Sequence, residues 1–233
     1  MNAHVSAIRV CILAITIALG ASNIGKARDD KDSDWSSNFS VNKSNLVSKG
    51  TNSYFVLEPG HVSHFQGGNE TLTISVLDET KFVDGVETRV VEEREEKNGK
   101  LVEVSRNYFA IDKTTNAVYY FGEDVNIYKD GKVVNHEGAW LSGIEGAKFG
   151  LMMPGQPKVG DKFYQELAPK VAMDRCEIVA IEEEFKTPAG SFKNCLRIKE
   201  TTPLEKGAGY KVYAPGVGLL KDDELLLTKT GKP

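Results

Sequence analysis

The chain has 233 residues, of which 40% are hydrophobic and 27% charged. It is therefore long enough to bury a core without metal or disulfide support, and its composition excludes collagen-like, fully disordered and multi-span membrane proteins. Its 29 basic and 33 acidic residues nearly balance, whereas a nucleic-acid-binding domain normally shows a basic excess. We expect a globular protein with no nucleic-acid partner.

The first 27 residues have the features of a secretory signal peptide. One positive charge, Arg9, precedes an apolar run over residues 10–19, and the first acid is Asp29. A run of this length is too short to span a bilayer, which takes about 20 residues, so an uncleaved anchor is the weaker alternative. Cleavage could follow Ser22 or Ala27. The sequence predicts an exported protein, periplasmic or extracellular, whose mature chain has no transmembrane span.

Residues 28–53 are polar and lack hydrophobic periodicity, which predicts a flexible lead-in. From Tyr54 onward the pattern is typical of β-strands, and no stretch has the composition of an interdomain linker. We therefore expect a single β domain over residues 54–233.

Three dipeptides between strand-like runs predict tight β-hairpins: Asp84-Gly85, Asn98-Gly99 and Asp130-Gly131. Their residues tolerate the positive φ angles of a type I′ turn, whose twist matches that of a hairpin. Centring the second hairpin on its dipeptide places Arg94 opposite Glu103 as a favourable charge pair.

The hairpins predict an all-β fold, a long antiparallel meander that forms a strongly curved sheet or a partly open barrel. Residues 139–160 interrupt it with one irregular loop rich in Gly, Pro and Met, which still carries enough apolar residues to fold back on the sheet. Strands resume from Asp161 onward.

The two cysteines after the signal sequence, Cys176 and Cys195, flank the predicted turn at residues 187–190. If Phe185 pairs with Phe192, the sulfurs lie roughly 20 Å apart along the ladder, whereas a disulfide needs Cα atoms within about 7 Å. A bulge could close that gap. A disulfide and two buried free thiols therefore both remain open.

Catalytic and metal-binding motifs are scarce. Of His61, His64 and His136, the first two are three residues apart, and such positions face opposite sides of a strand, which argues against a metal site. No nucleophile elbow or phosphate-binding loop is present. We predict no catalytic residue, metal or cofactor, with a hydrolase site assembled in space around one of these histidines as the alternative.

Acidic runs at residues 92–96, 182–184 and 222–224 lie near predicted hairpin ends. Neighbouring residues on a strand alternate faces, so we interpret these runs as solvated strand ends that discourage edge pairing. The alternative is that two carboxylates of these runs form a catalytic pair.

Aromatic residues on adjacent predicted strands suggest an apolar pocket, because ligand sites of β-barrels lie at the mouth and methionine packs adaptably against ligands. A core role is the simpler explanation for such residues. The predicted ligand-binding residues are Tyr108, Tyr120, Trp140, Met152 and Met153.

Five segments, at residues 54–60, 120–125, 153–161, 187–192 and 213–219, together resemble a family of uncharacterised exported bacterial β-rich domains. A broader likeness is to the curved-sheet domains of lipoprotein carriers and related envelope proteins. The resemblance implies an envelope location and a single β-rich domain. It carries over no activity and no catalytic residue, because the family has none established and a fold does not fix a function.

The leading hypothesis is a non-catalytic exported envelope protein that binds a partner or a small apolar ligand through its curved sheet. The alternatives are the assembled hydrolase and a structural or assembly factor without a pocket.

Overall fold

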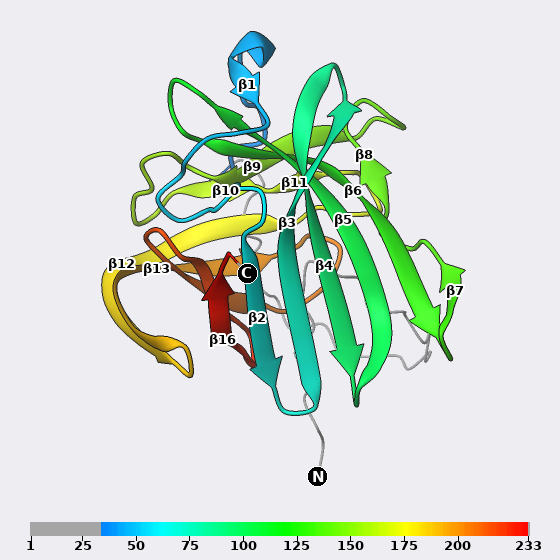
Figure 1. Ribbon diagram of the computed structural model, residues 1–233. Coiled ribbons are helices and arrows are strands. Elements are labelled where there is room, and N and C mark those ends of the chain that lie inside the picture. Colours follow the sequence, from blue (N-terminus) through cyan, green and yellow to red (C-terminus); the bar gives the residue numbers. More distant parts are fainter. Residues whose placement is uncertain (1–33, 233) are drawn as a thin grey trace, which may run out of the picture.

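A computed structural model describes residues 34–232 of the protein (Figure 1). The predicted signal peptide, its cleavage sites and the first part of the predicted lead-in lie outside the described residues. The elements are η2 (Lys43–Asn45), β1 (Leu46–Val47), β2 (Val62–Gly67), β3 (Glu70–Val83), β4 (Val86–Lys97), β5 (Lys100–Asp112), β6 (Val118–Lys129), β7 (Lys132–Asn135), β8 (Trp140–Leu141), β9 (Lys148–Met153), β10 (Lys162–Tyr164), β11 (Glu166–Leu167), β12 (Arg175–Thr187), β13 (Gly190–Thr201), β14 (Gly209–Ala214), β15 (Gly218–Asp222) and β16 (Leu225–Gly231).

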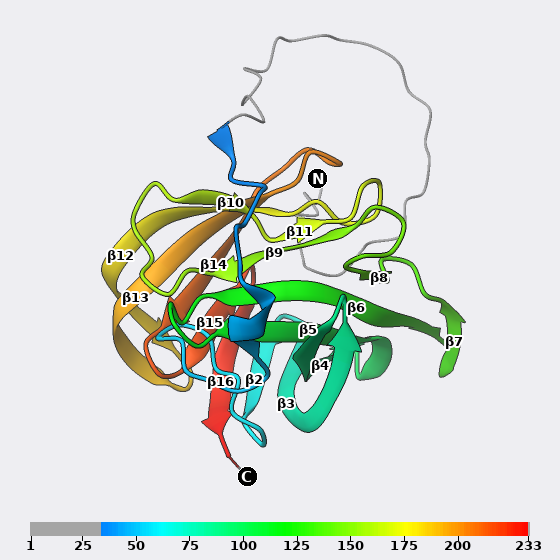
Figure 2. The ribbon, with the colours of Figure 1, turned by 90° about the horizontal axis from the view of Figure 1, so that it is seen from above.

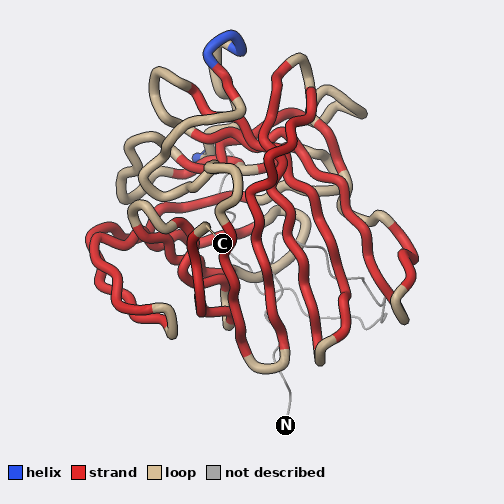
Figure 3. Tube along the Cα trace, in the orientation of Figure 1, coloured by secondary structure: helices blue, strands red, loops and turns tan. Residues whose placement is uncertain are grey.

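The strands form one antiparallel sheet that nearly closes into a barrel (Figures 1 and 2). The hydrogen-bonded order is β10-β12-β13-β14-β15-β16-β2-β3-β4-β5-β6-β9-β11, with β1 on β5 and with β7 and β8 on β6. The two ends of this order, β10 and β11, are separated along the chain by Gln165 alone. The predicted all-β meander with a strongly curved sheet is therefore confirmed, and strands dominate the trace in Figure 3.

The three predicted turns all lie at hairpin reversals. The turns Asp84-Gly85, Asn98-Gly99 and Asp130-Gly131 connect β3 to β4, β4 to β5 and β6 to β7, and both residues of each have positive φ. This is the backbone of a type I′ turn, so the local chemistry of the dipeptides does determine the reversals.

The predicted pairing of Arg94 with Glu103 is wrong by one residue. A bulge between Glu95 and Glu96 shifts the register, so Arg94 lies opposite Val104 and Glu95 lies opposite Glu103. Because a one-residue slip reverses which face each side chain occupies, the bulge turns an expected surface ion pair into two buried acids that face each other.

The described part of the predicted lead-in makes contacts with the barrel. Within residues 34–53, Ser36 bridges Phe163, and β1 pairs with β5 through Leu46 and Val47. Trp35 is only 5% exposed. Polar composition hid these few apolar anchors, which are enough to hold the segment against the sheet.

The Gly- and Pro-rich stretch at residues 139–160 folds back on the sheet through the short strands β8 and β9, both paired with β6. Gly122 on β6 makes the crossing with β8 possible. It has a φ of +128°, and a Cβ at this position would lie 2.2 Å from the carbonyl oxygen of Trp140. Only glycine permits both this backbone and this approach.

The largest hydrophobic cluster fills the barrel and is called the interior cluster below. Its members include Leu57, Phe109, Tyr120, Met153, Ile178, Leu196, Ile198 and Tyr213. A second cluster, which includes Tyr108 and Phe121, lies beneath the segment around β1. A third, which includes Phe65, Cys195 and Leu227, joins the C-terminal strands to β2 and β3.

Candidate functional site

A cavity of about 90 Å³ opens inside the barrel. It is bounded by β2–β6, β9, β14, β15 and the segment that leads into β2, and most of its lining is apolar. A mainly apolar cavity with a few placed polar groups is the usual form of a small-molecule site. The apolar lining includes Phe55, Val56, Phe65, Ile74, Val76, Val91, Phe109, Met152, Val217 and Leu219.

The strand period of two explains how neighbouring strands supply these side chains. Ile74 and Val76 are alternate residues of β3, and Val91 of β4 lies directly opposite Val76. Since alternate residues share a face, the Thr/Leu/Ile alternation along β3 puts its apolar set inside the barrel.

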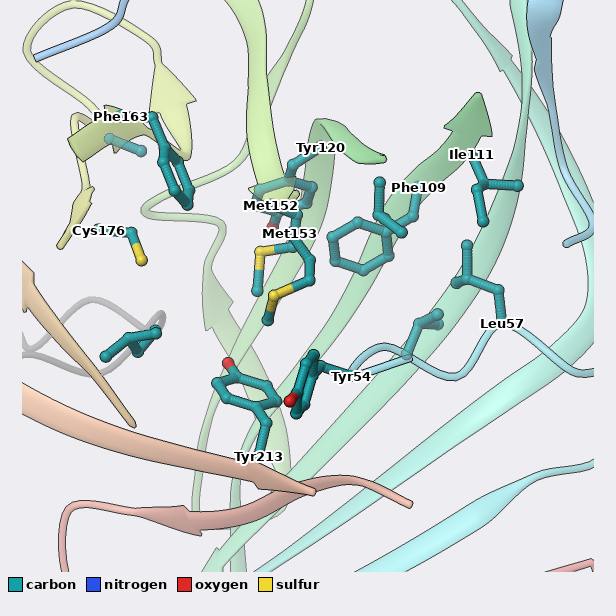
Figure 4. Close-up of a cluster of buried hydrophobic side chains, with 14 of the residues drawn as sticks. Tyr54, Leu57, Phe109, Ile111, Tyr120, Met152, Met153, Phe163, Cys176 and Tyr213 are labelled. Carbon is teal, nitrogen blue, oxygen red and sulfur yellow. The ribbon is translucent and has the colours of Figure 1, made fainter. Parts of the chain in front are cut away.

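Aromatic rings form one end of the cavity. Phe109 stacks on Tyr120 with ring centroids 4.7 Å apart and meets Phe55 edge-on at 4.9 Å. Figure 4 shows Tyr54 and Tyr213 facing this group, with the methionine side chains between them. These contacts fix the walls before any ligand enters.

A buried ion cluster forms the polar end of the cavity. Lys211 Nζ lies 3.0 Å from Glu200 Oε2 and 3.6 Å from Asp222 Oδ2, and Asp222 is its direct partner across β14 and β15. Burial opposes the charged form of Lys211, but Asp222 and Glu200 raise its pKa well above the usual value, so the ammonium stays charged. Burial raises the pKa of Glu200 to about 7, although Lys211 opposes that shift.

Glu93 of β4 lines the same cavity. Burial raises its pKa to about 8, Lys211 acts in the opposite direction, and Glu95 adds to the rise. Among the described residues, no hydrogen bond or ion pair reaches its carboxyl group. At pH 7 Glu93 is therefore mostly a neutral acid facing an apolar space.

The amide of Asn107, which lines the cavity, links side chains of β5 and β6. It accepts a hydrogen bond from Tyr120 Oη and donates one to Ser105 Oγ at 3.0 Å. Asn107 and Ser105 are both buried residues of β5. A satisfied network of this kind holds the wall in one arrangement.

Further acids continue the polar interior beyond the cavity. Burial raises the pKa of Glu123 and of Glu166 well above the usual value and that of Asp174 to about 6. Neighbouring carboxylates reinforce the shifts of Glu123 and Glu166. The interior thus contains an excess of acids over bases, and burial keeps several of these acids protonated near neutral pH.

The structure separates the three histidines. His61 lines the cavity, and its Nε2 lies 3.3 Å from Ser63 Oγ and 3.0 Å from Thr230 Oγ1. Burial lowers its pKa, so the ring is neutral at pH 7. His64 and His136 are exposed and do not line the cavity. Across residues 34–232, no group of three or more His, Cys, Asp or Glu side chains is arranged to hold a metal ion.

Two of the five predicted ligand-binding residues, Tyr120 and Met152, line the cavity. Trp140 packs edge-on against Tyr120, with centroids 5.4 Å apart, and so supports the wall from behind. Met153 belongs to the interior cluster without lining the cavity. Tyr108 belongs to the second cluster, because it is adjacent to Phe109 and faces the other side of β5.

Both cysteines are buried free thiols, so the disulfide left open by the sequence is not formed. Phe185 does pair with Phe192, but bulges place Cys195 opposite Glu183, and Cys176 lies opposite Glu200. Cys176 belongs to the interior cluster and Cys195 to the third cluster. Burial raises the pKa of both thiols, which makes them unreactive.

The polar end of the cavity is the part of the site that the sequence did not predict. Glu93 and Asp222 lie in runs interpreted as solvated, yet both face the interior. A signal was present, because Glu93 shares its strand face with Val91. Nothing comparable marked Lys211, whose partners come from two other strands.

The fold and the cavity define a barrel-like all-β protein with a small internal site. No helix among the described residues is long and apolar enough to cross a membrane. No family model matches the sequence, and no curated protein matches it. Among solved structures, a candidate lipoprotein from Parabacteroides distasonis matches at 14% identity and a TM-score of 0.40, covering 78% of this chain and all of that one. Similarity at this level carries no argument about function, so the predicted family resemblance and export stay predictions.

Proposed function

We propose that this protein is a non-catalytic exported envelope protein that binds a small, mostly apolar ligand inside its barrel. The observation that carries the proposal is the cavity, with its aromatic and aliphatic walls. Its volume of about 90 Å³ corresponds to about three water molecules at liquid density, so the ligand, or the part of it that enters, is short. The signal-peptide features of residues 1–27 support the location.

Two adjacent methionines provide a direct test. Met152 lines the cavity, whereas Met153 is buried beside it. We expect 1-butanol, a short-chain apolar probe, to shift the ¹³C-methyl resonance of Met152 saturably and that of Met153 much less. Met173 lies outside the cavity and serves as an internal control.

A cavity-filling variant completes this test. Val91 faces the cavity opposite Val76, so Val91→Met should occupy the space and weaken butanol binding at least fivefold. Circular dichroism and the thermal midpoint verify the fold, because overpacking itself costs about 1–3 kcal/mol. Equal binding by a folded variant, or no saturable response of Met152, would overturn the proposal.

The contact of His61 with Ser63 keeps a hydrolase as the second candidate. A catalytic pair of this kind needs an acid to orient the imidazole, whereas His61 Nε2 contacts the hydroxyl groups of Ser63 and Thr230. If the site is catalytic, Ser63→Ala abolishes turnover of a short-chain ester without changing butanol binding. We expect no turnover in the unchanged protein.

A further inference from the structure

The cavity lining contains more acidic than basic groups, and binding of an apolar ligand does not explain this excess. Two carboxyl groups, from Glu93 and Asp222, line it together with one ammonium group from Lys211. That ammonium already contacts Glu200 and Asp222. Lys211 therefore forms ion pairs with two acids. Glu93 forms none with any described residue.

Two acids at this end each have a carboxyl oxygen without a hydrogen-bond partner among the described residues. Asp222 is 8% exposed, and its Oδ1 is buried with no hydrogen-bond partner. Glu93 has neither a hydrogen bond nor an ion pair. Native proteins rarely leave a buried acceptor such as Asp222 Oδ1 unpaired, so this atom indicates a missing donor, which a ligand can supply.

We infer that the ligand is a small organic cation, a primary alkylammonium whose chain lies against the aromatic wall and whose head group donates hydrogen bonds to Glu93 and Asp222. The inference rests on the proposed function and names its ligand class. An ammonium group supplies three donors and a positive charge, which complete the two unpaired acceptors. An anionic ligand finds no free cation in the cavity, since Lys211 is already paired with two carboxylates.

Binding of the cation is coupled to loss of a proton. Glu93 is mostly protonated at pH 7 in the empty cavity, because its pKa is about 8. The ammonium binds the carboxylate, so the Glu93 proton leaves to solvent while the ligand keeps its own. Affinity should therefore rise about fiftyfold between pH 6 and pH 8 as Glu93 ionises.

Other titratable groups face Glu93 and must be separated from it. Glu200, with a pKa of about 7, titrates in the same range. The pH profile is therefore compared between the unchanged protein and Glu93→Gln, which keeps the shape and removes the charge. The facing groups are Glu95 on β4, Glu103 on β5, Glu123 on β6, Lys211 on β14, Asp222 on β15 and His61 before β2.

The experiment titrates the full-length chain with n-butylammonium, 1-butanol and butyrate at pH 8, read at the Met152 methyl resonance. We expect butylammonium to bind at least tenfold more tightly than butanol, and butyrate to bind most weakly. Glu93→Gln should lower the ratio of butylammonium affinity to butanol affinity at least tenfold. Glu96→Gln removes an exposed acid from the same strand and should change neither.

Each outcome separates the ligand class from the proposed function. Equal affinity for butanol and butylammonium, or no effect of Glu93→Gln, overturns the cation and leaves apolar binding intact. Preference for butyrate overturns it in favour of an anion site at Lys211. Failure of all three probes overturns the proposed function as well.

Discussion

Glu93 shows how one partly buried acid links the interior to pH. Its pKa rises from 4.5 to about 8 on folding, chiefly through burial. Between these values the folded state binds more protons than the unfolded state, so the free energy of unfolding falls as pH rises, by about 1.4 kcal/mol per pH unit for each such group. The stabilising contribution is complete below pH 4.5 and is lost as pH rises through 8.

Glu93→Gln should therefore reduce the loss of stability between pH 5 and pH 8, by up to about 4 kcal/mol. Urea unfolding at both pH values measures this. Glu96→Gln, on the exposed side of the same strand, is the control and should leave the pH dependence unchanged. A Glu93→Gln profile as steep as that of the unchanged protein would contradict the raised pKa of the acid.

Lys211 should be more important for stability than any surface lysine. Lys211→Met leaves Glu200 and Asp222 buried without their cation, which costs about 3–5 kcal/mol. Adding Glu200→Gln and Asp222→Asn removes the uncompensated charges and should recover most of that loss. Urea unfolding at pH 7 tests both steps, and a single variant within 1 kcal/mol of the unchanged protein would disprove the buried ion cluster.

On the scale of single elements, β6 depends on a glycine. Gly122→Ala must both adopt a φ of +128° and place its Cβ against the Trp140 carbonyl. Gly131 is the matched control, since it too has a positive φ, but open space surrounds its added Cβ. We expect Gly131→Ala to cost about 1 kcal/mol and Gly122→Ala clearly more, measured by thermal unfolding.

The hairpins on either side of β4 show what the sequence could and could not predict. The reversals at Asp84-Gly85 and Asn98-Gly99 were predictable, because a type I′ turn is a local property of two residues. The bulge between Glu95 and Glu96 was not, because it depends on how long strands fit a curved sheet. Since that bulge sets which acids face inward, the apolar wall of the site could be predicted better than its polar end.

At the scale of the whole molecule, the chain before the barrel is part of the folded unit. Trp35 is buried, with the Arg175 guanidinium 4.7 Å and the Lys162 ammonium 5.4 Å from its ring centroid. Cation–π contacts with a desolvated ring add to the burial of its large apolar surface.

Trp35→Ala should accordingly destabilise the protein by about 3–5 kcal/mol. Chemical denaturation measures the change, and Ser36→Ala, at the exposed neighbouring position, should stay within about 0.5 kcal/mol of the unchanged protein. A loss below 1 kcal/mol for Trp35→Ala would favour the flexible lead-in that composition suggests.

The pairing of β2 with β16 joins Val62 to Gly231. Every other strand from β3 to β15 lies between these two in the sequence, so the ladder cannot be completed until Gly231 has left the ribosome. Contacts this far apart make folding slow. During synthesis the apolar residues of the future barrel interior therefore stay exposed to solvent. Molecular chaperones that bind extended chains have time to bind these residues before the barrel folds.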